Sequence, residues 1–161
     1  MSLFHIPSFS QMRIALYWGL GFLTFVVPFG LATGLFDWRP VLDPATVARS
    51  AVIALVLPAF FEELFFRGPL LALQARGRSV PARAIVLSLA LFVLWHPFNG
   101  MFIMHDAREL FTDWRFLTVA TILGAVATVI ALQTRSLWLA VLFHWGVVLG
   151  WKVFLGAPDL F

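Results

Sequence analysis

A few ionisable side chains lie inside long apolar runs, and these are the residues of this sequence that could do chemistry. One run carries Glu62, Glu63 and Arg67 among phenylalanines. His96 ends a second apolar run, and His144 lies inside a third. A charge at the middle of a bilayer costs roughly 2.5–3.5 kcal/mol on insertion scales, so such groups usually face a bundle interior and mark a functional site.

Helical spacing gives the two glutamates different roles. Glu63 and Arg67 are four residues apart, so they can pair on one helix face in the favourable acid-first order. Glu62 is rotated by about 100° from Glu63 and has no partner on its own helix. A carboxylate held by an arginine is a poor base, whereas a carboxylate without such a partner can take a proton from water. We therefore expect Glu62 to be reactive and Glu63 and Arg67 to be structural.

Two glutamates and two histidines on three helices could meet in one water-filled pocket. This requires the helix that carries Glu62 to continue beyond Arg67, because His96 would otherwise lie at a different depth. At 1.5 Å per residue, His96 is roughly 20–24 Å from the inner end of its helix. We expect the helix to continue through Leu70–Gln74 with a kink at Pro69.

The composition indicates that these residues are positioned by membrane-spanning helices. Of 161 residues, 61% are hydrophobic and 12% are charged, which is about half the charged fraction of a soluble domain. There is no cysteine, so disulfides, thiol catalysis and thiolate metal sites are excluded. The formal net charge is only +3, and no basic cluster is long enough to bind nucleic acid. We expect the lipid bilayer, not nucleic acid, to be the surroundings of this chain.

The expected fold class is all-α, a polytopic transmembrane helical bundle with about five spans. Runs of roughly 18 or more apolar residues are typical of spanning helices. Residues 1–44 would form an N-terminal helix and loop, and residues 45–161 a catalytic core. The expected spans are Ile14–Phe36, Ala48–Phe66, Ala84–His96, Phe116–Thr134 and Leu137–Leu155, and the short connections include 76–81, 97–100 and 133–136.

The distribution of arginines predicts how the bundle is oriented. The segment from Arg67 to Arg83 holds four arginines and no acid, and Arg13 and Arg135 fall on the same side. Basic residues concentrate on the cytoplasmic side of membrane proteins. The N-terminus is therefore expected in the cytoplasm, and a bacterial inner (plasma) membrane fits a multi-pass protein of this size.

The order of the polar residues forms a recognisable pattern. The motif E-E-x-x-x-R, from Glu62 to Arg67, is followed by F-x-x-x-H, which ends at His96, and by His144 on a later helix. The pattern resembles that of the CAAX protease and bacteriocin-processing family, also called the Abi family or the type II CAAX prenyl endopeptidases. The resemblance covers about Ala45–Leu155.

This resemblance implies an endopeptidase that works inside the membrane. Glu62 and His96 would activate a water molecule that attacks the scissile carbonyl, and His144 would help to hold the oxyanion. The implied substrate is a membrane-anchored protein or peptide, cut near its C-terminus, with a prenylated or a sorting-signal tail as the two alternatives. No cofactor is implied.

One position departs from the family pattern. The last helix of the family usually reads H-x-x-x-N, but here Val148 stands four residues after His144. An amide donor at this place normally supports the tetrahedral intermediate, where one donor can contribute a few kcal/mol. Asn99, just after His96, is the candidate replacement. Trp95 and Trp145 flank the candidate histidines and are expected to line a substrate groove.

Three other interpretations remain open at this stage. Glu62, His96 and His144 form a His₂Glu set, which is a ligand type of catalytic zinc, although no H-E-x-x-H motif is present. Metal-free chemistry is the preferred interpretation. The chain could also be a non-catalytic membrane immunity or scaffolding protein, with Val148 marking lost chemistry. Proton or ion transport is less favoured, because five spans without a repeat are unusual for a transporter.

Overall fold

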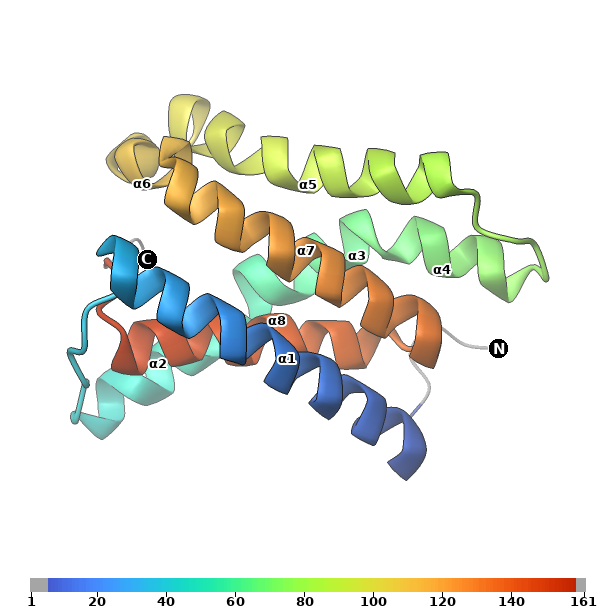
Figure 1. Cartoon of the computed structure of the whole chain (residues 1–161), viewed down its shortest axis with the longest axis horizontal. Helices are drawn as coiled ribbons and strands as arrows, with labels where there is room; N and C mark the ends of the chain where they lie inside the picture. The colour runs from blue at the N-terminus through green and yellow to red at the C-terminus, as the bar shows by residue number, and fades with distance from the viewer. Residues whose placement is uncertain (1–5, 159–161) are drawn as a thin grey trace.

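The structure is a bundle of helices that cross one another at moderate angles (Figure 1). It is a computed structural model that describes residues 6–158. Within this range five helices are long and apolar enough to cross a membrane, and no strand is formed, which confirms the expected all-α bundle of five spans. The helices are α1 (Phe9–Thr33), α2 (Pro44–Ala54), α3 (Phe61–Phe66), α4 (Gly68–Ala75), α5 (Ala82–Phe102), α6 (Arg108–Thr112), α7 (Trp114–Thr134) and α8 (Leu137–Phe154).

The first helix lies closer to the N-terminus than expected. It begins five residues earlier, at Phe9, because Ser8 caps the start: its side chain accepts a hydrogen bond from the Gln11 backbone N–H. It ends three residues earlier, at Thr33, because Gly34 adopts the left-handed conformation with φ of 72°. Apolar residues alone predict a span but not its ends, which depend on these caps.

The second span is not one regular helix. Leu55–Phe60 forms a π-helical segment between α2 and α3, and Pro58 lies inside it. Proline has no N–H to donate and its ring clashes with the preceding turn, and a wider π turn accommodates both effects. The segment also changes the rotation of α3 relative to α2. It thereby sets the direction in which Glu62 and Glu63 leave the helix.

The helix restarts after Arg67 and continues as α4, as expected from the depth of His96. The break falls at Arg67, and Pro69 stands in the first turn of α4. The Ser88 hydroxyl of α5 donates to the carbonyl of Phe66 over 2.7 Å. Such side-chain donors satisfy carbonyls that a broken helix leaves free in an apolar environment.

The expected end of the third span at His96 is wrong. Helix α5 continues through Pro97 to Phe102, so the expected 97–100 loop is helical. A proline removes only one hydrogen bond from a helix, whereas a loop inside the membrane would leave several backbone groups without partners. His96 is thus an interior position of α5, and Asn99 follows it almost one turn later.

Helix α7 is the most buried of the five spans and holds the bundle together. It runs antiparallel to α1, as two hydrogen bonds at opposite ends show. Gln11 donates to the Thr134 carbonyl over 2.6 Å, and Arg115 donates to the Thr33 carbonyl over 2.8 Å. Helices α5 and α8 pack on other faces of α7, and α3 packs on α5 and α8. These helices place their polar residues toward a common interior.

Candidate active site

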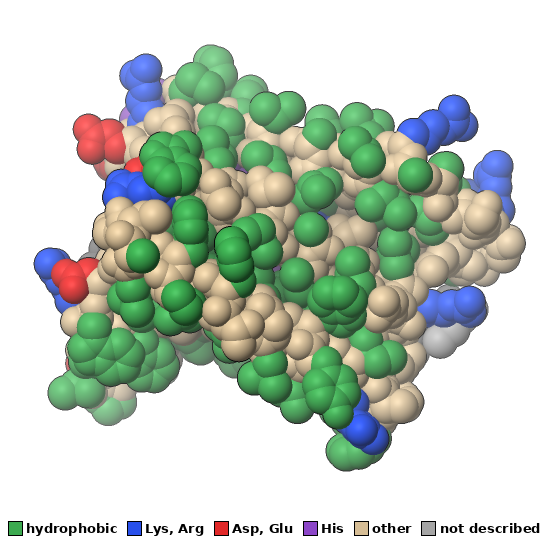
Figure 2. All heavy atoms as spheres, viewed as in Figure 1, with side chains coloured by type: hydrophobic (Ala, Val, Ile, Leu, Met, Phe, Trp, Pro, Cys, Tyr) green, Lys and Arg blue, Asp and Glu red, His purple; other side chains and the backbone are tan. Residues whose placement is uncertain are grey.

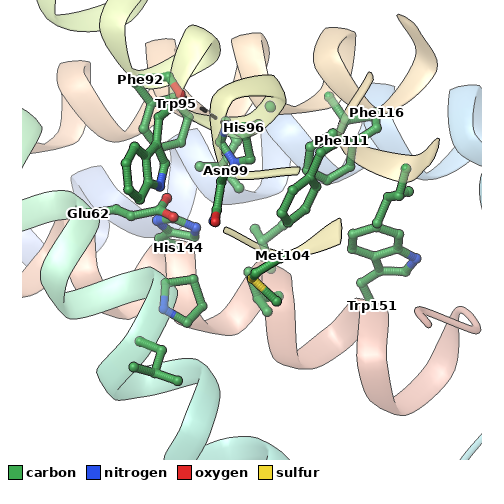
Figure 3. Close-up of a pocket in the computed structure, with 18 of the residues that line it drawn as sticks. Glu62, Phe92, Trp95, His96, Asn99, Met104, Phe111, Phe116, His144 and Trp151 are labelled. Carbon is green, nitrogen blue, oxygen red and sulfur yellow. Dashed lines mark hydrogen bonds between the residues drawn. The ribbon is translucent and has the colours of Figure 1, made fainter. Parts of the chain in front are cut away.

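A cavity of about 570 Å³ lies between α3, α5, α7 and α8. Its walls are mainly apolar and aromatic, and residues 103–111 contribute to one end. A largely apolar cavity with a few convergent polar groups is typical of a binding or active site. Figure 3 shows the polar groups that meet in it. The polar lining residues are Glu62, His96, Asn99, His144 and Lys152.

Glu62 leaves α3 toward this cavity and not toward lipid. In Figure 3 its carboxylate points to the ring of His144, with the indole of Trp95 beside it. Its Oε2 atom is buried and has no hydrogen-bond partner among the described residues. A buried carboxylate oxygen without a partner is costly unless a ligand or water satisfies it. The expectation that Glu62 lacks a partner on its own helix therefore agrees with the geometry.

The ring of His96 is held so that one nitrogen faces the cavity. Its Nδ1 atom lies 3.0 Å from the carbonyl oxygen of Phe92, one turn earlier in α5. Because a carbonyl can only accept, Nδ1 carries the proton, and Nε2 of the neutral ring keeps a lone pair. Edge-to-face contacts with the rings of Phe111 and Phe116, at 5.6 and 5.2 Å between centroids, fix the plane of the imidazole.

His144 is held by Glu63, a contact that helical spacing did not predict. Its Nδ1 atom lies 2.9 Å from Oε1 of Glu63. The same carboxylate oxygen lies 3.3 Å from the guanidinium of Arg67, which confirms the expected pair. Glu63 and Arg67 are both fully buried. A carboxylate that accepts Nδ1–H sets the orientation of an imidazole and leaves Nε2 for the site.

Arg67 can be buried against α7 because Gly124 has no side chain at the point where the guanidinium contacts this helix. Its guanidinium donates to the Gly124 carbonyl over 2.8 Å and to the Thr128 hydroxyl over 3.3 Å. A Cβ atom at position 124 would lie 2.9 Å from the guanidinium and 2.7 Å from the Phe92 ring. The guanidinium also lies 4.2 Å from the centroid of that ring, within cation–π range. Close packing at Gly124 therefore serves the ion pair.

Asn99 lines the cavity, as does Val148, the residue at the family's usual asparagine position. The Asn99 side-chain oxygen is buried without a partner among the described residues and points toward the centre of the site (Figure 3). Trp95 lines the cavity as expected. The expectation for Trp145 is wrong, because its indole N–H donates to the Ala51 carbonyl of α2 over 2.8 Å and the side chain lies outside the cavity lining.

Comparison with known protein families identifies the family to which this chain belongs. Residues 44–150 match the family described as type II CAAX prenyl endopeptidase Rce1-like. The chain belongs to this family. Neither the curated proteins nor the solved structures gave a match. The matched region of the Rce1-like chain contains Glu62, His96 and His144 together with Glu63 and Arg67, whereas α1 precedes it.

A metal centre in this Rce1-like site would need several potential ligands close together. Among residues 6–158, no three His, Cys, Asp or Glu side chains lie close enough together to hold a metal ion. The Nδ1 atoms of His96 and His144 bond to Phe92 and Glu63, and Nε2 of each ring remains available.

Sequence reasoning missed two parts of the Rce1-like site. Phe92 bonds His96 through its carbonyl, and its ring lies between Arg67 and the imidazoles of His96 and His144. Its place in F-x-x-x-H, four residues before the histidine, was a usable signal. The other part is the 103–111 segment, whose Met104 and Phe111 line one end of the cavity. No sequence motif marks this segment.

Proposed function

We propose that this Rce1-like protein is an intramembrane endopeptidase that hydrolyses a peptide bond near the C-terminus of a membrane-associated protein. The observation that supports this most is the convergence of Glu62, His96 and His144, from three separate helices, on one largely apolar cavity. Each histidine has Nδ1 engaged and Nε2 available. Membership of an endopeptidase family agrees with this reading.

Glu62 and His96 activate the attacking water in this proposal. The carboxylate of Glu62 accepts one proton of the water, and the lone pair on Nε2 of His96 accepts a hydrogen bond from the other O–H. The water oxygen then forms a bond to the scissile carbonyl carbon, and the carbonyl becomes an oxyanion. A positioned general base of this kind contributes typically about 10²- to 10⁴-fold to the rate.

His144 and Asn99 face the developing negative charge. For this role His144 must hold protons on both ring nitrogens before the attack and keep them throughout. Nδ1–H then donates to Glu63 and Nε2–H to the oxyanion, and no proton is taken up or released here. The side-chain oxygen of Asn99 points toward the centre of the site, and rotation of the amide about its Cβ–Cγ bond brings the N–H₂ group there instead. That group is then a second donor and takes the place of the asparagine that Val148 replaces. Donors fixed in an apolar cavity stabilise such charge more strongly than they would in water.

Collapse of the tetrahedral intermediate returns the proton. Protonated Glu62 donates it to the nitrogen of the scissile bond, the C–N bond breaks, and the products are a carboxylic acid and an amine. Glu62 is then a carboxylate again and can activate another water. No step consumes a cofactor or changes an oxidation state.

The walls of the cavity suit an apolar substrate that arrives from the bilayer. Leu57, Phe61 and Phe65 line the cavity, yet each is more than half exposed on the outside of the bundle. These side chains would contact lipid and also a substrate segment that moves from the lipid into the cavity. A C-terminal tail, either prenylated or of the sorting-signal type, has the apolar character that this surface favours.

The proposal is tested by comparing membranes that contain wild-type protein, Glu62→Gln or His96→Ala. New protein termini in each membrane fraction are labelled and identified by mass spectrometry. Termini produced by this protein should be present with wild type and absent with both variants. Glu109→Gln, which changes an exposed glutamate outside the cavity, is the matched control and should behave as wild type. Identical termini in all four samples would reject the proteolytic function.

One observation supports a second candidate, a non-catalytic membrane scaffolding or immunity protein. Val148 lines the cavity where the family usually carries an amide donor. If the protein acts only by binding, Glu62→Gln should leave its association with a crosslinked partner and its cellular effect unchanged. The same variant therefore separates the two functions.

A further inference from the structure

The two ends of the bundle carry different charge. One end, here called the arginine end, is formed by the start of α1, the α4–α5 connection and the end of α7. In Figure 2 it shows basic side chains and no acidic ones. Within residues 6–158 no Asp or Glu lies there, and its basic residues are Arg13, Arg76, Arg78, Arg83 and Arg135.

The opposite end, here called the mixed end, is close to neutral. It is formed by the α1–α2 connection, residues 103–113 and the end of α8. Its acids are Asp37, Asp43, Asp106, Glu109 and Asp113, and five basic residues accompany them: Arg39, Arg49, Arg108, Arg115 and Lys152. Two of these arginines form ion pairs with the aspartates two residues earlier in the chain. The side-chain bond from Arg115 lowers the pKa of Asp113, which keeps that pair ionised.

Arg67 belongs to neither end, although the sequence groups it with Arg76 and Arg78. It is fully buried and pairs with Glu63 inside the bundle. Removing it from the count leaves equal numbers of basic residues at the two ends. The two ends therefore differ in their acidic residues. Among residues 6–158, acids balance the basic residues at the mixed end, whereas the positive charge of the arginine end has no nearby acid. A negative membrane potential inside the cell favours that end in the cytoplasm.

The cavity extends from the candidate catalytic groups toward the mixed end only. Its lining includes Ile103 and Met104 after α5 and Trp151 and Pro158 at or beyond the end of α8. None of its lining residues comes from the stretches 67–91 or 124–143, which build the arginine end. On that side the buried Glu63–Arg67 pair and the hydrogen bond from Arg67 to Gly124 lie outside the lining of the cavity.

We propose that the active-site cavity opens on the extracytoplasmic side of the membrane. The substrate would then be an exported protein, held in the membrane by an apolar segment, whose scissile bond reaches the site from outside. A cytosolic protein that carries a lipid on its C-terminus could not present its tail to this opening. The identity of the substrate class rests on the proposed proteolytic function, whereas the direction of the opening does not.

The test uses the absence of cysteine from the chain, which gives a background without labelling. Single cysteines are introduced at His105 and Ala45, both exposed at the mixed end, and at Ser79, exposed at the arginine end. Bacterial cells that hold each variant in the inner membrane are treated with a membrane-impermeant maleimide, before and after the membrane is permeabilised. His105→Cys and Ala45→Cys should label equally in both conditions, and Ser79→Cys only after permeabilisation.

A fourth variant reports on the cavity itself. Met104 lines the cavity near its mixed end, so Met104→Cys should react with a small, negatively charged thiol reagent added to intact cells. Labelling of Ser79→Cys in intact cells would overturn the proposal, as would labelling of both ends alike. So would a Met104→Cys variant that reacts only after permeabilisation or not at all. Each variant is first checked for wild-type accumulation in the membrane, and Ala45→Cys replaces His105→Cys if that variant fails to accumulate. None of these results depends on peptide cleavage.

Discussion

The imidazole of His144 donates from Nδ1 to Oε1 of Glu63 over 2.9 Å, inside a layer that excludes solvent. Because the same oxygen faces Arg67, one carboxylate both neutralises a buried cation and orients a histidine that lines the cavity. The three charged residues of the E-E-x-x-x-R motif thus have two different roles. Glu62 faces the cavity, and Glu63 and Arg67 hold the wall behind it.

Replacing Glu63 with glutamine should destabilise the protein. Arg67 would then be buried without an anion, and breaking a buried ion pair from one side costs about 3–5 kcal/mol. The unfolding midpoint in detergent should therefore fall clearly. The double variant Glu63→Gln with Arg67→Met should lose less stability than the sum of the losses in Glu63→Gln and Arg67→Met, because neither charge is then buried alone. A Glu63→Gln protein as stable as wild type would contradict a stabilising ion pair between Glu63 and Arg67.

Glu62→Gln should lower the rate of cleavage without lowering the stability of the protein. No ion pair is removed, so the unfolding midpoint should stay within experimental error of wild type. Loss of the general base should lower the rate of cleavage by about 10²- to 10⁴-fold. Measuring both quantities on the same purified samples makes the comparison direct. A variant that retained cleavage would show that Glu62 is not the base.

Gly124→Ala should disturb the site from a distance. The added methyl group would lie 2.9 Å from Arg67, 2.7 Å from Phe92 and 2.8 Å from Leu89, so one of them must move. Overpacking of this kind costs about 1–3 kcal/mol. Gly146→Ala is the matched control, since nothing lies within 4 Å of its added carbon. We expect reduced stability and cleavage for Gly124→Ala only, and equal behaviour of the two variants would argue against close packing at Gly124.

Asn99→Ala should lower the turnover rate more than substrate affinity. The amide is proposed to bind the oxyanion, which exists only along the reaction, and loss of one such donor costs about 10²- to 10³-fold in kcat. Val148→Asn, which restores an amide on another wall of the cavity, should recover part of this loss in the double variant. A change confined to KM would instead assign Asn99 to substrate binding.

Metal chelators should leave cleavage unchanged. No three potential ligands gather in the described part of the chain, so the reaction is not expected to need a bound ion. Purified protein is incubated with a strong chelator, its metal content is measured by elemental analysis, and its activity is compared with an untreated sample. Activity that disappears and then returns on addition of zinc would establish the metal-dependent alternative.

Several features could be predicted from the sequence because they depend on composition and local spacing. Apolar runs separated by short polar connections are enough to predict five spans, since each span satisfies its own backbone hydrogen bonds. The spacing of Glu63 and Arg67 is enough to predict their pair, because residues four apart share a helix face. The two histidines lie in separate apolar runs, so the sequence also predicts that they come from separate helices.

Other features depended on contacts between helices. The continuation of α5 through Pro97 depends on the apolar surroundings and on the close approach of α6 at Gly100, which no local pattern encodes. The π-helical turn at Pro58 changed the rotation of α3, which an ideal 100° step could not anticipate.

The chain by itself determined that this is a membrane bundle with an acid, two histidines and a buried arginine inside it. Only the tertiary structure decided that Glu63 holds His144, that Gly124 makes room for Arg67, and that the cavity extends toward one end of the bundle. The reason is physical. Spacing along a helix fixes which side chains share a face, but the partner that each face meets depends on how separate helices pack.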